Sequence, residues 1–174
     1  MFRLKILLFF VICVSFSSCS KEPINKSTIK EKSLELQVQE AYNEGMDSLE
    51  GGDVLFAAKK FNEAEMLFPQ AKSAPQSALM AAYSYYTQDY YGDAIAELER
   101  FLKVYPTHKD LVYAYYLLAV CYYEQIVDEK KDLQSILNAK DTFTFLLKKF
   151  PNTEYALDAE FKLNMINDIL ASKE

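Results

Sequence analysis

The sequence has no tryptophan, one histidine and three cysteines among its 174 residues. Metal sites and nucleophile relays usually gather several histidine, cysteine or acidic groups, so their scarcity argues against an enzyme. We expect no catalytic residue and no metal ligand. Only four glycines and five prolines are present, which argues against a β-chain of tight turns and leaves room for long helices. A net charge of −6 does not provide the basic surface that a nucleic-acid partner requires.

Residues 1–18 have the organisation of an export signal. Arg3 and Lys5 precede an apolar stretch over residues 6–16, which is too short to cross the ~30 Å hydrocarbon core of a membrane as a helix. The motif Phe16-Ser17-Ser18-Cys19 resembles the lipobox of bacterial lipoproteins, in which the cysteine receives a diacylglycerol and becomes the new N-terminus. We therefore expect a signal peptide over residues 1–18 and lipidation of Cys19. The alternative is an ordinary secretory signal with an incidental cysteine.

A lipidated tether is expected over residues 19–33, which are polar and lack a sustained apolar period. The diacylglycerol and an N-linked acyl chain on Cys19 are the bound groups we expect, with no other cofactor. Removal of residues 1–18 takes away two of the 19 basic residues, which leaves 17 against 25 acidic residues, a charge of −8. Because such a surface does not favour anionic lipid, the lipid anchor is the expected contact with the membrane.

The chain beyond residue 33 repeats one helical pattern three times. In each copy, apolar residues at successive offsets of 4, 3 and 4 are followed directly by a proline. The copies are Ala57, Phe61, Ala64, Phe68 and Pro69; Ala94, Leu98, Phe101, Tyr105 and Pro106; and Ala139, Phe143, Leu146, Phe150 and Pro151. These offsets place the apolar residues on one face of a helix that ends near the proline.

Small residues recur in the segment before each of these helices. Gly45, Ala82 and Ala119 lie 37 residues apart, and each lets a neighbouring helix approach closely. The step from Ala119 to Ala139 is eight residues longer than the step from Ala82 to Ala94. We assign the extra residues to a longer turn between residues 125 and 134.

These spacings resemble the tetratricopeptide repeat, a two-helix unit with a small residue, an alanine, an aromatic residue and a proline at set places. The resemblance implies an all-α superhelix of three helix pairs plus one C-terminal helix at about 153–172, in a domain over residues 34–174. A simple helical bundle is the alternative, but it needs no repeating register. Asp53 is a predicted helix N-cap, and Ser73 with Gln76 has the spacing of a capping box.

In the tetratricopeptide-repeat family, the first helices of successive pairs line a groove. The resemblance places six tyrosines at groove-facing positions, one turn away from the packing positions. They are Tyr42, Tyr83, Tyr86, Tyr113, Tyr116 and Tyr123. Tyrosine offers a large ring for stacking and a polar tip at low entropic cost, so we expect a groove that binds peptides with aromatic side chains. The alternative for each ring is that it fills the packing between helices.

Short runs at residues 78–86, 94–101, 105–110, 115–117 and 121–126 together resemble the BamD family, the outer-membrane lipoproteins of the β-barrel assembly machinery. The resemblance implies a lipid-anchored scaffold that faces the periplasm from the outer membrane and helps to recognise, fold and insert outer-membrane β-barrel proteins. It also implies two kinds of partner. One is a BamA-like barrel protein with other subunits of the machinery, and the other is the aromatic-rich C-terminal peptide of an unfolded barrel protein.

Members of this family usually carry further C-terminal repeats, which dock the barrel-forming partner. The peptide groove is therefore the better supported of the two expected surfaces in this chain. The alternative function belongs to a different class, a general periplasmic tetratricopeptide adaptor lipoprotein for envelope or division proteins. Such an adaptor would share the anchor and the fold but would have no role in barrel assembly.

Overall fold

The computed structural model describes residues 32–125 and 133–172, which contain seven α-helices and no strand. The helices are α2 (Leu34–Glu50), α3 (Val54–Leu67), α4 (Ala74–Tyr86), α5 (Tyr91–Val104), α6 (Leu111–Glu124), α7 (Leu133–Lys149) and α8 (Glu154–Ala171). None of these described helices is long and apolar enough to span a membrane. The predicted signal peptide, the tether up to residue 31 and Cys19 lie outside the described residues.

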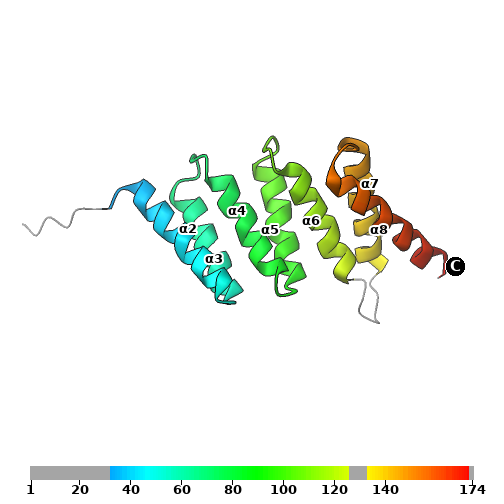
Figure 1. Ribbon diagram of the computed structural model, residues 1–174, viewed down its shortest axis with the longest axis horizontal. Coiled ribbons are helices and arrows are strands. Elements are labelled where there is room, and N and C mark those ends of the chain that lie inside the picture. Colours follow the sequence, from blue (N-terminus) through cyan, green and yellow to red (C-terminus); the bar gives the residue numbers. More distant parts are fainter. Residues whose placement is uncertain (1–31, 126–132, 173–174) are drawn as a thin grey trace, which may run out of the picture. The chain divides into compact units, whose positions relative to one another are not determined.

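Consecutive helices pack side by side in the order of the sequence (Figure 1). The pairs α2–α3, α4–α5 and α6–α7 are the three predicted helix pairs, and α8 packs on α7 and also contacts α6. α8 holds the place of the first helix of a further pair, because the same register positions are buried in α4, α6 and α8. They are Ser77, Ala114 and Ala159 and, seven residues further on, Ser84, Cys121 and Ile166.

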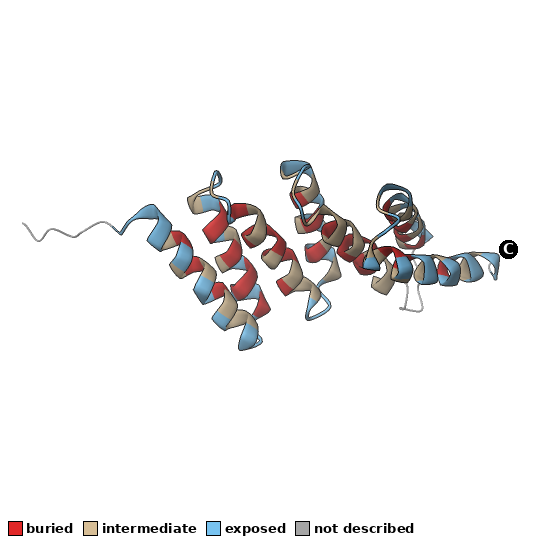
Figure 2. Ribbon diagram, turned by 45° about the horizontal axis from the view of Figure 1, so that its top comes forward, coloured by how far each residue is buried: buried red, intermediate tan, exposed pale blue. Residues whose placement is uncertain are grey.

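The second helices supply the centre of the core. The side chains of Phe61, Phe101 and Phe143 are fully buried at the positions that the repeat pattern predicts. Buried positions recur along the helices, and exposed ones gather at the turns between them (Figure 2). Burial of one such ring contributes roughly 1.5–3 kcal/mol. The last apolar residue of each copy is only half-buried, because it lies where the helix ends, next to the proline.

Small residues allow the close approach inside each pair. A carbon atom added at Gly45 of α2 would lie 2.8 Å from Cε1 of Phe61 on α3, which is closer than two carbon atoms approach without strain. Ala82 and Ala119, at the equivalent positions of the next two pairs, are fully buried. The structure therefore confirms the role predicted for these three positions.

The insertion in the third pair is shared between a helix and a turn. α3 and α5 begin three residues before Ala57 and Ala94, whereas α7 begins six residues before Ala139. Three of the eight extra residues thus lengthen α7 by about one turn, and the prediction that all of them form a turn is wrong. Ile136, at the position where α3 and α5 begin, is fully buried, whereas Leu133 in the added turn is 52% exposed. Residues 126–132 of the predicted turn lie outside the described part of the chain.

One of the predicted helix starts is correct and the other is wrong. Asp53 caps α3, because its side-chain oxygen accepts a hydrogen bond from the Phe56 amide at 3.1 Å. Ser73 precedes α4 but already has helical backbone angles, and its side chain makes no capping bond. Its carbonyl instead accepts from the Ser77 amide at 3.0 Å. The capping box predicted from Ser73 and Gln76 does not form.

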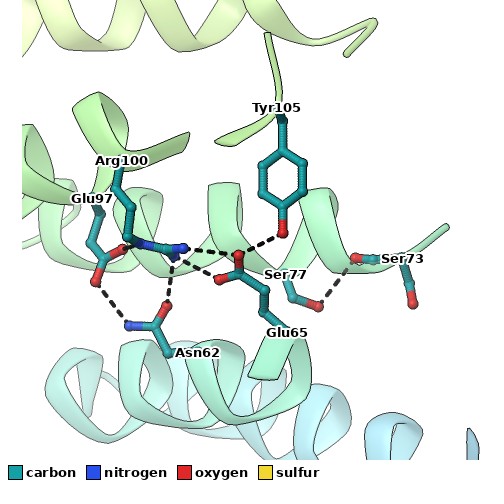
Figure 3. Close-up of polar contacts among 7 residues, drawn as sticks. All are labelled: Asn62, Glu65, Ser73, Ser77, Glu97, Arg100 and Tyr105. Carbon is teal, nitrogen blue, oxygen red and sulfur yellow. Dashed lines mark hydrogen bonds and ion pairs between the residues drawn. The ribbon is translucent and has the colours of Figure 1, made fainter. Parts of the chain in front are cut away.

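A buried ion pair joins the first and second helix pairs (Figure 3). Glu65 on α3 is only 5% exposed, and Arg100 on α5 donates to both of its carboxylate oxygens, at 2.9 and 2.6 Å. The Tyr105 hydroxyl donates to the same carboxylate at 2.6 Å. Glu97 accepts hydrogen bonds from Arg100 and from Asn62, each at 2.9 Å. This network holds α5 at one position on α3.

Gly45→Ala is expected to lower the free energy of unfolding by about 1–3 kcal/mol, although alanine is the better helix former by about 1 kcal/mol. The added methyl group would press on the Phe61 ring, which is fully buried and has little room to move. Gly92→Ala on α5 is the matched control, because nothing lies within 4 Å of the added carbon, and it should leave the stability unchanged or raise it. Urea unfolding followed by circular dichroism measures both. Equal stability of Gly45→Ala and the wild type would contradict the close contact.

Arg100→Met is expected to lower the free energy of unfolding by about 2–3 kcal/mol, because the buried carboxylate of Glu65 loses its charged partner. The double variant Glu65→Leu/Arg100→Met should recover part of this loss, since it leaves no buried charge unpaired. Lys103→Met, at an exposed position of the same helix, is the control and should change the stability by less than about 0.5 kcal/mol. If Arg100→Met and Lys103→Met unfold at the same urea concentration, the ion pair does not stabilise the fold.

Candidate peptide-binding groove

Tyrosines from α4, α6 and α8 form a cluster. Tyr155 on α8 lies beside two tyrosines of α6, with its ring centroid 5.8 Å from that of Tyr113 and 5.0 Å from that of Tyr116. On α4, the ring centroids of Tyr83 and Tyr86 are 6.3 Å apart, and both tyrosines pack with Tyr113 against one buried cluster. The structure thus brings four of the six predicted tyrosines together and adds Tyr155.

Burial raises the pKa of three tyrosines in this cluster. It raises the pKa of Tyr86, Tyr113 and Tyr116 above the ordinary tyrosine value of 10.0. For Tyr116, a second cause is the hydrogen bond that its hydroxyl donates to Oδ2 of Asp158 at 2.7 Å, which further raises its pKa. A phenol is already protonated at neutral pH, and the raised pKa of these three tyrosines extends that state to more alkaline pH.

One cavity, which we call the Tyr113 cavity, lies beside the cluster and measures about 480 Å³. Its lining comes from α4, α6, α8 and the turn before α6. The lining residues are Gln76, Leu79, Met80, Tyr83, Lys109, Asp110, Tyr113 and Tyr155. A dry apolar cavity of about 150 Å³ holds a benzene ring, so the Tyr113 cavity has room for an aromatic side chain of a ligand.

The second cavity, which we call the Tyr42 cavity, also measures about 480 Å³ and opens between α2 and the start of α4. It is lined by Glu35, Val38, Gln39, Tyr42, Phe68, Ala71, Lys72, Ser73 and Gln76. The ring of Tyr42 packs edge-on against Phe61, with 5.2 Å between the centroids. Gln76 lines both cavities, so they are neighbours. We call the two cavities together the groove.

The six predicted tyrosines divide into two groups. Tyr42, Tyr83 and Tyr113 line the groove. Tyr86, Tyr116 and Tyr123 line neither of the two cavities and pack against the core shared by α6, α7 and α8. The second group thus fills the packing between helices, whereas the first group can contact a ligand in the groove.

Tyr123 is the most separate of the six, because α8 covers it. The Nζ atom of Lys162 lies 4.9 Å from the centroid of its ring. Its hydroxyl donates to the sulfur of Met165 at 3.6 Å, and the Phe143 ring packs edge-on against it at 6.5 Å. The ring is therefore half-buried and already has contacts within the protein on the side that faces α8.

Sequence reasoning missed Tyr155 on α8, which lines the Tyr113 cavity. Tyr155 follows Pro151 by four residues, and the equivalent positions of the two preceding units are Ser73 and Asp110. Because neither of these is aromatic, the repeat register carried no signal for Tyr155.

Each cavity of the groove has one basic and one acidic side chain in its lining. Lys72 and Glu35 line the Tyr42 cavity, and Lys109 and Asp110 line the Tyr113 cavity. The two lysines lie 37 residues apart, in the turns before α4 and α6, and both are exposed. Lys109 has Asp110 as a distant partner, with 3.8 Å between Nζ and Oδ2. The charges of the rim therefore balance.

The remaining chemistry of the described residues favours binding. No group of three or more histidine, cysteine, aspartate or glutamate residues among them could hold a metal ion. Cys121 is fully buried in α6, and burial raises the pKa of its thiol to about 12, so the thiol is unreactive at neutral pH. The groove offers ring surface, the Gln76 amide and charged groups of both signs, which together suit a peptide.

Comparison with known proteins gives a family match over the whole described region. Residues 34–174 match a family model described as outer membrane lipoprotein (YfiO). The chain is 35% identical over 164 residues to the outer membrane protein assembly factor BamD of Caulobacter vibrioides, which covers 94% of this chain and 53% of that protein. It is 38% identical over 133 residues to BamD of Rickettsia prowazekii, which covers 76% of this chain and 53% of that protein. The chain therefore spans about half the length of these two relatives.

Solved structures show the same fold at low sequence identity. The first TPR domain of human RPAP3 is 18% identical to the chain and superposes with a TM-score of 0.57, covering 79% of this chain and 94% of that domain. This likeness confirms the tetratricopeptide-repeat fold that the spacing of the small residues and prolines predicts.

Proposed function

Because the chain belongs to the YfiO family of outer membrane lipoproteins, which includes the BamD assembly factors, we propose that it is a lipid-anchored scaffold for the assembly of β-barrel proteins at the outer membrane. In this proposal it is a binding protein and not an enzyme. Its groove holds extended segments of unfolded barrel proteins. The observation that carries the proposal is the pair of tyrosine-lined cavities joined at Gln76.

The chemistry of the groove matches that of such segments. Strands of membrane β-barrels alternate apolar and polar residues and carry aromatic residues at both membrane interfaces. An unfolded barrel segment therefore presents large apolar side chains at alternate positions. Tyr83, Tyr113 and Tyr155 offer stacking surface for them, while the open form of both cavities favours release. Few strong contacts would permit transfer of the segment to the next component.

The anchor is the second part of the proposal. Lipidation of Cys19 would hold the protein on the periplasmic face of the outer membrane, and the polar residues up to 33 would let the repeat domain stand away from the lipid. The mature charge of −8, from 17 basic and 25 acidic residues, supports attachment by the lipid over electrostatic attachment.

The third part concerns protein partners. The names of the relatives, outer membrane protein assembly factors, support contact with other subunits of the machinery, including a BamA-like barrel protein. In this chain, the exposed side chains of Phe161 and Leu157 on α8 offer apolar surface to such a partner protein.

Tyr83→Ala and Tyr113→Ala are each expected to weaken binding of a barrel-strand peptide by about 5- to 30-fold, because each variant removes a ring from the wall of the Tyr113 cavity. The peptide carries phenylalanine at alternate positions, and fluorescence anisotropy measures its affinity for the lipidated protein in detergent. Circular dichroism establishes that each variant is folded.

Tyr90→Ala is the matched control, since Tyr90 is 41% exposed and lines neither cavity. Its affinity for the peptide should equal that of the wild type. Equal affinity of Tyr83→Ala, Tyr113→Ala and the wild type would contradict the groove. Binding of unrelated envelope peptides as tightly as the barrel peptide would instead favour the general adaptor.

Cys19→Ser is expected to move the protein from the outer-membrane fraction to the soluble periplasmic fraction, because no acyl chain can then be attached. Fractionation of cell envelopes and mass spectrometry of the N-terminal peptide measure the location and the lipid. Ser20→Ala serves as the control, since it leaves the thiol in place. A Cys19→Ser protein that stays with the outer membrane would contradict anchoring by the lipid.

A further inference from the structure

Gln76 lines both the Tyr42 cavity and the Tyr113 cavity. It lies in the first turn of α4, where its side chain is half-buried. Each cavity measures about 480 Å³, which is enough for an aromatic ring. A ligand that places one side chain in each cavity must therefore run across Gln76.

The side-chain amide of Gln76 has no hydrogen-bond partner within residues 32–125 and 133–172. The capping-box partner suggested by the sequence is absent, because the Ser73 backbone is already helical. An amide carries two N–H donors and a carbonyl acceptor. A ligand that covered these groups without pairing them would bind more weakly. The occupant of the groove is thus expected to offer both a donor and an acceptor at this point.

An extended peptide has the matching groups. The side chains of residues i and i+2 point to the same face, about 6.6 Å apart. The N–H and C=O of a single residue in such a strand point toward the same edge. We propose that the two cavities take apolar side chains i and i+2 of one extended peptide, and that the Gln76 amide pairs with the main-chain N–H and C=O of the residue between them. This inference rests on the proposed peptide-binding function and assigns the residue that reads the main chain.

The charged side chains around the groove balance one another. Glu35 and Lys72 line the Tyr42 cavity, and Lys109 and Asp110 line the Tyr113 cavity. A peptide with neutral residues beside its apolar pair therefore suits this rim. The occupant is an extended segment with alternating apolar residues and neutral flanks.

The test uses the full-length lipidated protein in detergent and a short synthetic peptide with phenylalanine at positions i and i+2, threonine between them and neutral polar flanks. A second peptide has an ester in place of the amide N–H of the central threonine, and a third has the same ester near one end. The wild type should bind the central ester about 3- to 10-fold more weakly than the amide peptide. The terminal ester should bind as the amide peptide does.

Gln76→Met should weaken binding of the amide peptide by a similar factor, and the central ester should then cause no further loss. Gln70→Met, at an exposed position in the turn before α4, is the control and should behave as the wild type. A central-ester penalty of equal size in the wild type and in Gln76→Met would overturn the main-chain contact. Equally tight binding of a peptide with phenylalanine at i and i+3 would overturn the two-cavity register.

The outcomes separate this inference from the function on which it rests. If the wild type binds none of the peptides, the proposed function fails. If binding depends on Tyr83 and Tyr113 but is unchanged in Gln76→Met, the peptide-binding function stands and the role assigned to Gln76 is wrong.

Discussion

The contact between a small residue on the first helix and a large one on the second sets the geometry of each helix pair. In the first pair the Phe61 ring fills the space that Gly45 leaves open. In the second, Ala82 and Leu98 lie in one buried cluster, and in the third Ala119 and Phe143 do the same. This contact commits one face of each first helix to packing against the second helix. The residues about one turn away are not needed for that contact, and some of them line the groove.

The groove tyrosines serve both packing and surface. Tyr113 is buried enough for its pKa to rise, yet it still forms part of the wall of the Tyr113 cavity. A ring held by its neighbours has little conformational freedom left to lose when a ligand arrives, which favours binding by a preformed site. Tyr123 illustrates the other outcome, since its ring already contacts α8. The position of α8 therefore determines how far the tyrosine surface extends.

Prediction from sequence succeeded where a local period carried the information. The buried faces of α3, α5 and α7 follow from offsets of 4, 3 and 4 before a proline, and Phe61, Phe101 and Phe143 are buried as expected. It was less successful for the groove, because a residue's place in the repeat does not state how closely the next helix covers it. Half of the six tyrosines line a cavity. The Gln76 side chain faces the groove, although its spacing from Ser73 suggested a cap.

The sequence by itself determined the class of fold, the pairing of helices and the family, because helical period and repeat length are properties of neighbouring residues. Only the tertiary structure decided which side chains meet across pairs. Glu65 and Arg100 are 35 residues apart, and Tyr155 reaches Tyr113 and Tyr116 from α8. Such contacts depend on small rotations and shifts between packed helices. The sequence period of a single helix carries no information about these rotations. The same rotations leave Gln76 in the lining of two cavities, with no hydrogen-bond partner for its amide in the part of the chain that the structure describes.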